Sequence, residues 1–202
     1  MGIFRRPAVQ PVLDRELAAA VERLEERSYT TYLARLKARD RLNLRNNAWN
    51  ASLISLATST TIASVGLLVD REMYGSGGEA LLVSLAILSL VASLVVSSMN
   101  YGARSRAMEA NYKRIQQISL SAESFFVNPA APTRQRLLEL SNEYGISLEN
   151  SENHSNSDYL RSKGAPWYRV WRDSLVNFAP LVTLAIPAIL IVPFAKWFFD
   201  GL

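Results

Sequence analysis

Residues 81–96 read LLVSLAILSLVASLVV, sixteen consecutive positions without a charged side chain. This run lies inside a longer uncharged stretch, 80–103, which begins after Glu79 and ends before Arg104. A helix of about 20 residues crosses the hydrocarbon core of a bilayer, because each residue adds about 1.5 Å. A soluble helix of that length carries a polar face toward water. The stretch therefore predicts a transmembrane helix.

Two further uncharged stretches, 48–69 and 174–195, are also long enough to cross a bilayer. The stretch 48–69 is less apolar, and a buried core helix is the alternative interpretation for it. Because the connection 70–79 is short, we expect 48–69 to insert together with 80–103 as a helical hairpin. Its seven hydroxyl residues are Ser52, Ser55, Thr58, Ser59, Thr60, Thr61 and Ser64.

Basic residues are distributed unevenly around these stretches. Of the 22 Lys and Arg residues, ten precede residue 48 and ten lie in 104–173, whereas the loop 70–79 and the C-terminal tail contain one each. Segments rich in Lys and Arg stay on the cytoplasmic side of a membrane. We therefore expect the N-terminus and the region after the hairpin in the cytoplasm, and the loop and the C-terminus outside.

Charged segments with helical periodicity extend both halves of the predicted hairpin. Residues 12–46 contain neither Gly nor Pro, and apolar residues recur there at the helical period, as they do again in 104–127. We expect these two helices to pack on each other as an antiparallel coiled coil, or on copies of themselves. The predicted contacts between cytoplasmic helices are Leu33, Leu36, Met108, Tyr112 and Ile115.

The predicted fold is an all-α membrane protein, a transmembrane hairpin extended by long cytoplasmic helices, with a third C-terminal transmembrane helix. After the second cytoplasmic helix, a short helix is expected over 133–144, closed by Gly145, and the polar run 149–158 is expected to be a loop. The parts are a cytoplasmic N-terminal helix (1–47), the hairpin (48–103, with spans 48–69 and 80–103), a cytoplasmic helical region with the polar loop (104–158), and an interfacial helix with the third span (159–202, span 174–195).

Small side chains, most of them hydroxyls, share one face of 48–69, and serines recur at every fourth residue from 89 to 97 in the second span. Close packing of the hairpin is one interpretation, since small residues let transmembrane backbones approach each other. A polar lining for an oligomeric pore is the other, because the consecutive hydroxyls 58–61 cannot all face the second span. The candidates for pore lining or hairpin packing are Ser52, Ser55, Thr58, Ser59, Thr61, Ser89, Ser93 and Ser97.

Four asparagines lie near the cytoplasmic ends of the hairpin. Three of them, Asn46, Asn47 and Asn50, are at the start of the first span, and Asn100 is at the end of the second. They are candidates for the mouth of a pore. The equal alternative is that they cap or bridge the helices.

No pattern in the sequence is typical of an enzyme. The single histidine, His154, lies in the polar run without an evident partner to orient it as a base. There is no glycine loop of the kind that holds phosphates and no cluster of metal ligands. We expect no catalytic residue, no metal and no cofactor. Direct binding of nucleic acid is not favoured, because Asp and Glu are interleaved with the basic residues of the N-terminal segment.

A known family shares this layout. A charged helix with YLAR at 32–35 and RNN at 45–47 leads into the hairpin, which is followed by NYK at 111–113 and Ile115. Over 13–127 this arrangement resembles the SLATT domain proteins, two-transmembrane effectors associated with bacterial nucleotide-signalling and anti-phage systems. The third span looks like the extension of a subgroup whose genes are often found beside reverse transcriptases.

The resemblance implies an oligomeric, pore-forming effector of the bacterial inner membrane. Its partners would be membrane lipid, further copies of the chain, and a cytoplasmic signalling protein, either a nucleotide-signalling enzyme or a reverse transcriptase. Opening the pore would disrupt the membrane and arrest the infected cell. The alternative is a non-conducting anchor that recruits a soluble cytoplasmic enzyme. Replacing Thr58 and Thr61 by Leu separates the two, since only a pore lined by these residues would lose function.

Overall fold

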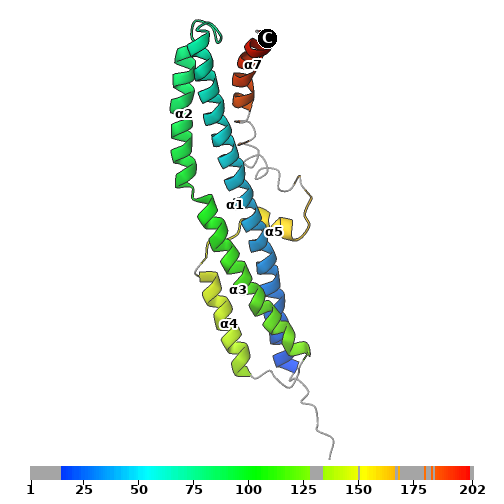
Figure 1. The fold of residues 1–202 in the computed structure, drawn as a ribbon. Helices are drawn as coiled ribbons and strands as arrows, with labels where there is room; N and C mark the ends of the chain where they lie inside the picture. Colours follow the sequence, from blue (N-terminus) through cyan, green and yellow to red (C-terminus); the bar gives the residue numbers. More distant parts are fainter. Residues whose placement is uncertain are drawn as a thin grey trace, which may run out of the picture. The chain divides into compact units, whose positions relative to one another are not determined.

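The computed structural model describes residues 15–127, 134–149, 151–166, 168, 180, 183 and 185–200. Every regular element among these residues is a helix, and Figure 1 shows their order along the chain. The chain divides into two compact units. We call residues 39–105 with 166–202 the hairpin unit, and residues 1–38 with 106–165 the bundle unit. The helices are α1 (Arg15–Val69), α2 (Gly78–Ser98), α3 (Tyr101–Val127), α4 (Arg134–Glu149), α5 (Asn156–Ser162) and α7 (Ala185–Asp200).

In the hairpin unit, the C-terminal half of α1 and α2 form an antiparallel pair around the turn 70–77. The turn depends on Gly75, whose φ of +74° is a conformation that L side chains rarely adopt. The Gly75 carbonyl accepts a 3.0 Å hydrogen bond from the amide of Gly78, where α2 begins. Leu67 and Leu82 are buried together at this end of the pair. The predicted hairpin is therefore present.

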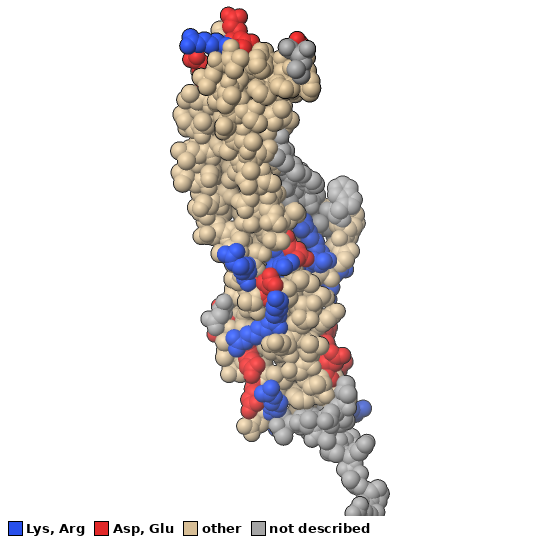
Figure 2. Space-filling model, viewed as in Figure 1, with Lys and Arg blue, Asp and Glu red and all other residues tan. Residues whose placement is uncertain are grey.

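Two helical segments are long and apolar enough to cross a membrane, one within α1 and one that begins at Gly78. Only 6% of the apolar window in the second segment is buried. A core helix of a soluble protein would be mostly buried, because exposing such a surface to water is costly. The visible face of the hairpin is also free of charged side chains between its two ends (Figure 2). The described part of the chain is thus all-helical, with two candidate membrane-spanning helices that point to a membrane protein.

Helix α7 runs along α1 in the hairpin unit, in the same direction as α1. Near one end of the pair, the hydroxyl of Thr183 shares a hydrogen bond with that of Ser52. Near the other, Leu190 is buried against Leu67, and its carbonyl accepts a 2.7 Å hydrogen bond from the Tyr74 hydroxyl. The C-terminal end of α7 therefore lies at the same end of the hairpin unit as the turn (Figure 1).

The predicted third span, 174–195, lies partly outside the described residues. Within the described part, α7 begins at Ala185 and continues past the predicted end to Asp200. Residues 167 and 169–173 of the predicted interfacial segment before it also lie outside the described residues.

In the bundle unit, the N-terminal part of α1 packs against α3 and α4 as three helices. Residues 21–24 of α1 meet residues 122–125 of α3, whereas Arg35 meets Asn111, so α1 and α3 are antiparallel. Helix α4 runs parallel to α1, since its later residue Tyr144 bonds Thr31 at 2.7 Å. The buried core consists of Val21, Leu24, Ala122, Phe125, Leu137 and Leu140.

A break separates α2 from α3, where the sequence predicted one continuous helix. Asn100 has a φ of +49°, the left-handed conformation that ends a helix. Asparagine tolerates this conformation better than other residues with a Cβ. Its carbonyl then accepts the first bond of α3, from the amide of Arg104 at 3.0 Å. The residue predicted at a pore mouth is therefore the hinge between two helices.

Two further predictions need correction. Helix α4 does not stop before Gly145 but continues to Glu149, because side chains from α1 and α3 bind its final turn. The predicted polar loop 149–158 contains the start of α5, at Asn156. The Ser155 side chain caps this helix. The Ser155 amide in turn donates a 3.0 Å hydrogen bond to the Asp158 carboxylate, which completes a capping box.

Candidate functional site

An open groove follows the seam between α1 and α2 in the hairpin unit. It comprises two adjoining cavities of about 390 and 490 Å³, which share Thr60, Ser64 and Ala86. Apolar side chains line the part near the turn together with Arg71 and Glu79, whereas hydroxyl side chains from both helices line the part farther from it. The hydroxyl residues of the groove are Thr60, Thr61, Ser64, Ser89 and Ser93.

The hydroxyls of the two helices differ in their hydrogen bonds. On α1, Thr60, Thr61 and Ser64 each donate to the carbonyl four residues earlier, at 2.7 to 2.9 Å. On α2, the hydroxyls of Ser89 and Ser93 have no hydrogen-bond partner among the described residues. Leaving a buried hydroxyl unpaired is unfavourable by about 1–3 kcal/mol in proteins, and by more in pure hydrocarbon. The α2 side of the groove can therefore still bind a polar group from outside the chain.

Other predicted pore residues belong to a packing face on α1 instead. Ser52 and Ser59 are 2% and 1% exposed, and Ser52 bonds Thr183 before α7. Gly66 continues this face, because a Cβ there would lie 2.8 Å from the Met73 sulfur and 3.1 Å from a ring carbon of Phe194 in α7. Small residues on this face let α7 approach α1 closely.

The structure thus divides the predicted hydroxyl set among three surroundings. Ser52 and Ser59 face buried packing, while Thr61, Ser89 and Ser93 line the groove. The remaining three line neither of these surfaces, since Ser55 is half-buried, and Thr58 and Ser97 are exposed.

The four predicted pore-mouth asparagines do not form one cluster. Asn46 is half-buried and its amide donates to Asn47 at 3.4 Å, a long bond between neighbours on one helix. Asn47 and Asn50 are exposed, and Asn100 occupies the hinge between α2 and α3. Any ring of these residues requires several copies of the chain.

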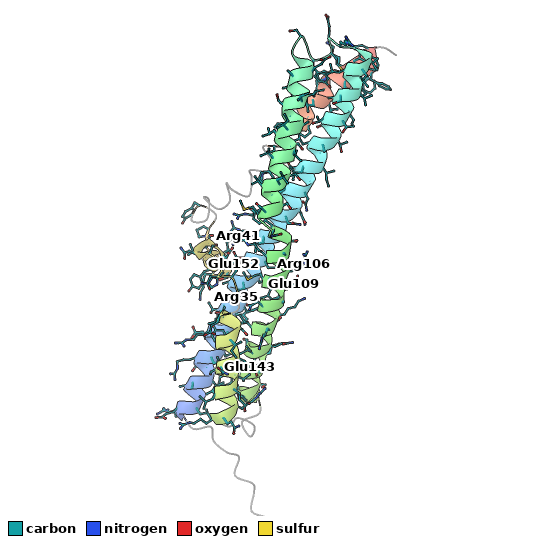
Figure 3. All side chains as sticks on the ribbon, turned by 90° about the vertical axis from the view of Figure 1, so that its left-hand side faces the viewer. Arg35, Arg41, Arg106, Glu109, Glu143 and Glu152 are labelled. Carbon is teal, nitrogen blue, oxygen red and sulfur yellow. The ribbon has the colours of Figure 1, made fainter. Side chains whose placement is uncertain are left out.

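A second polar centre lies in the bundle unit, around Arg35. Its side chain is 1% exposed and lies where α1 meets the end of α4 (Figure 3). One guanidinium nitrogen donates to the side-chain oxygen of Asn111 on α3 and, at 3.1 Å, to the Ser147 carbonyl on α4. The Asn111 amide donates to the same carbonyl at 2.8 Å. Three helices therefore meet in one hydrogen-bonded group, which the sequence analysis missed.

The burial of Arg35 also changes which residues of α1 face the other helices. Leu33 and Leu36 were expected between the cytoplasmic helices, yet both are only half-buried, and Ala34, Arg35 and Ala38 are buried instead. The apolar pattern of α1 failed here because Ser28 and Arg35 occupy core positions. On α3, Met108 and Ile115 are buried and Tyr112 is half-buried, with its ring 6.0 Å from that of Tyr32.

His154 lies close to this centre, two residues before the start of α5. Burial lowers the pKa of His154, the positive charge of Arg35 lowers it further, and Asp158 opposes both effects. Its Nδ1 atom is buried with no hydrogen-bond partner among the described residues, as is the Nε atom of Arg35. Burial also lowers the pKa of Arg35, which nonetheless remains charged.

The described residues offer no group of three or more His, Asp or Glu side chains that would hold a metal ion.

Comparison with known proteins adds one match. The family described as "SMODS and SLOG-associating 2TM effector domain family 5" matches residues 17–199. The matched range includes both units and almost all of α7, so it is not limited to the hairpin. No curated protein and no solved structure matches the chain significantly.

Proposed function

Because the chain belongs to the SMODS and SLOG-associating 2TM effector domain family, we propose that it is an oligomeric, pore-forming effector of the bacterial inner membrane. A cytoplasmic partner opens it, either a nucleotide-signalling enzyme, as the family name indicates, or a reverse transcriptase. The open assembly disrupts the membrane and arrests the growth of an infected cell, which is a form of antiviral defence.

The hydroxyl groove is the observation that carries this proposal. It lies on a helix pair whose α2 is almost entirely unburied, and Ser89 and Ser93 retain unpaired hydroxyls there. Hydroxyls that bond across transmembrane helices contribute about 0.6–2 kcal/mol each to association. A second copy of the chain, or water in a path between copies, supplies the missing partners. The groove thus supports both self-association and a polar pathway.

The orientation in this proposal places the bundle unit in the cytoplasm. The turn 70–77 and the end of α7 then lie outside, and 174–195 crosses the membrane as a third span. Two observations support it. Basic residues are dense on the proposed cytoplasmic side and sparse on the other. Helix α7 also runs parallel to the first span, so both end on the same side.

A second candidate function is a non-conducting membrane anchor that recruits a soluble enzyme. The observation in its favour is the bonding of Thr60, Thr61 and Ser64, whose hydroxyls are already satisfied by their own helix. Such a surface tolerates lipid and does not require water.

Leakage of a trapped dye from liposomes that carry the purified protein, with and without its genomic neighbour, tests the two candidates. We expect leakage that the neighbour triggers or suppresses. We expect the double variant Ser89→Ala with Ser93→Ala to reduce this leakage severalfold, and Thr61→Leu to do the same by filling the groove. Thr58→Leu adds bulk outside the groove and tests whether the exposed face of α1 also contributes.

The matched control is Ser84→Ala with Ser98→Ala, which removes two α2 hydroxyls that are outside the groove and donate to their own backbone. An equal reduction of dye leakage in both double variants would show that the groove has no special role. Tight liposomes under every condition, with the oligomer confirmed by chemical cross-linking, would favour the anchor.

A further inference from the structure

A second open groove lies in the bundle unit, between the first turns of α1 and of α4. Its volume is about 680 Å³, and it has no residue in common with the hydroxyl groove or the Arg35 centre. Leu17, Ala20 and Leu137 belong to or pack against the buried core and form its floor. Leu138 also lines it and is 64% exposed, so a large apolar side chain lies uncovered there.

Three arginines surround this apolar floor. Arg15 and Arg23 come from α1 and Arg134 from α4, and all three are exposed. None of them forms an ion pair or hydrogen bond with any residue that the structure describes. The single acidic residue of the groove, Glu16, leaves its lining with a net charge of +2, from three arginines and one glutamate. Uncompensated positive charge around an apolar surface favours an occupant that is both acidic and apolar.

The spacing of the arginines indicates the size of this occupant. Arg15 and Arg23 are eight residues apart on one helix, which corresponds to about 12 Å along its axis. Two charges at this separation match acidic groups about two helical turns apart better than a single phosphate or carboxylate. A polypeptide segment with acidic residues about two turns apart and a bulky apolar residue between them matches the groove in charge and in length. The chain's first 14 residues match it less well, because they contain Arg5 and Arg6 and a single acidic residue, Asp14.

We propose that this arginine-rimmed groove is the docking site for an acidic, amphipathic segment of a cytoplasmic partner protein. The proposal rests on the partner in the proposed function but not on pore formation. Docking there would connect α1 and α4, the two helices that also meet at Arg35. The segment would be recognised by carboxylates that pair with the arginines and by an apolar side chain that covers Leu138.

The test uses the full-length protein in detergent and two fluorescently labelled helical peptides. One peptide carries Glu on its polar face and Leu on its apolar face, and the other has Lys in place of every Glu. Fluorescence polarisation measures each dissociation constant. We expect the Glu peptide to bind and the Lys peptide to bind at least tenfold more weakly. Arg23→Glu and Arg134→Glu should each weaken binding of the Glu peptide about two- to fivefold, the range for exposed ion pairs.

Matched controls separate the groove from general charge effects. Arg136→Glu changes the net charge equally, but Arg136 already pairs with Glu139 at 3.0 Å and lies outside the groove. The double variant Arg23→Glu with Arg134→Glu should bind the Glu peptide about tenfold more weakly and the Lys peptide more tightly. The control double variant Arg27→Glu with Arg136→Glu should change the affinity for the Glu peptide less than twofold. Leu138→Ser should weaken binding, and Leu120→Ser, an exposed leucine on α3, should not.

Three outcomes would overturn the proposal. They are equal binding of both peptides, a loss of Glu-peptide affinity in the control variants as large as in the groove variants, and failure of the Glu peptide to bind. Stronger binding to phosphatidylglycerol vesicles than to the Glu peptide would assign the groove to a lipid surface and likewise overturn it. Peptide binding and liposome leakage are measured separately. A protein that binds the Glu peptide but causes no leakage would contradict only pore formation. A protein that causes leakage but does not bind the peptide would contradict only the docking site.

Discussion

Arg35 is a buried cation that donates its hydrogen bonds to two neutral oxygens, on Asn111 and Ser147. The carbonyl that it binds belongs to Ser147, in the last turn of α4, where backbone carbonyls lack partners within the helix. This end of a helix carries a partial negative charge, which stabilises a nearby cation. Asn111 binds both the guanidinium and the same carbonyl. The charge of Arg35 is therefore accommodated by the end of a helix and an amide.

We predict that Asn111→Ala destabilises the bundle unit. Arg35 would lose an acceptor while remaining buried, and a hydrogen bond to a charged group contributes about 1.5–3 kcal/mol. The midpoint of thermal unfolding, followed by circular dichroism in detergent, should fall. Asn142→Ala is the control, because Asn142 is an exposed asparagine on α4. Equal midpoints for the two variants would show that the Arg35 centre contributes little to stability.

We predict that His154 makes the bundle unit less stable in mild acid. Burial and the nearby Arg35 lower its pKa in the folded state. Above the usual histidine pKa of about 6.5, the residue is neutral in both states and stability is complete. As the pH falls through that value, the unfolded state binds a proton first, so stability declines until the pH is below the folded pKa.

Thermal unfolding measured between pH 8 and pH 5 tests this prediction. His154 is the only histidine in the chain, so its ring resonances in an NMR titration report the folded pKa directly. His154→Gln should remove most of the pH dependence in that range. A slope that persists in His154→Gln would assign the effect to other groups.

Among the elements, α1 shows how polar residues at core positions make the apolar pattern predict the wrong buried face. Its buried residues Val21, Leu24, Ser28, Arg35, Ala38 and Leu42 follow alternating spacings of three and four residues, with Thr31, half-buried, at the intervening position. Three of these seven side chains are polar, so a search for apolar residues assigns the stripe to Leu33 and Leu36 instead. The periodicity is correct, but the face is rotated.

At the hinge between α2 and α3, we predict that Asn100→Val is destabilising and Asn100→Gly is not. A β-branched residue at a φ of +49° costs about 1–2 kcal/mol, whereas glycine adopts this conformation without strain. Thermal unfolding of the two variants gives the comparison. If Val and Gly behaved alike, the hinge would be free to straighten, and α2 and α3 would form one helix.

For the whole molecule, we predict three membrane crossings with the N-terminal side in the cytoplasm. The chain contains no cysteine, so single cysteines introduced at exposed positions report topology without background. In intact spheroplasts, Ser76→Cys in the turn and Asp200→Cys at the end of α7 should react with an impermeant maleimide. Asn153→Cys, between α4 and α5, should react only after the membrane is permeabilised.

Labelling of Asn153→Cys in intact cells would reverse the proposed orientation. Protection of Asp200→Cys together with labelling of Ser76→Cys would mean that 174–195 does not cross the membrane. In that case the hairpin alone would span the bilayer.

The amino-acid sequence alone predicts the helical hairpin, because each crossing of a bilayer requires about 20 uncharged residues. The long helix predicted before the first span, which the structure describes from Arg15 onward as part of α1, followed from the absence of Gly and Pro in 12–46. The resemblance to the family followed from the same layout, and the match over residues 17–199 confirmed it.

Other features required the folded chain. Which hydroxyls line the groove and which meet α7 depends on how three helices rotate against one another, and every face of span 48–69 has small or hydroxyl residues. Arg35, Asn111 and Ser147 are far apart in the sequence, and a charged residue in a core position opposes the usual hydrophobic pattern. The arginine-rimmed groove likewise unites the starts of two helices more than 100 residues apart. Hydrophobicity determines whether a segment enters the membrane, but packing geometry alone determines which side chains meet.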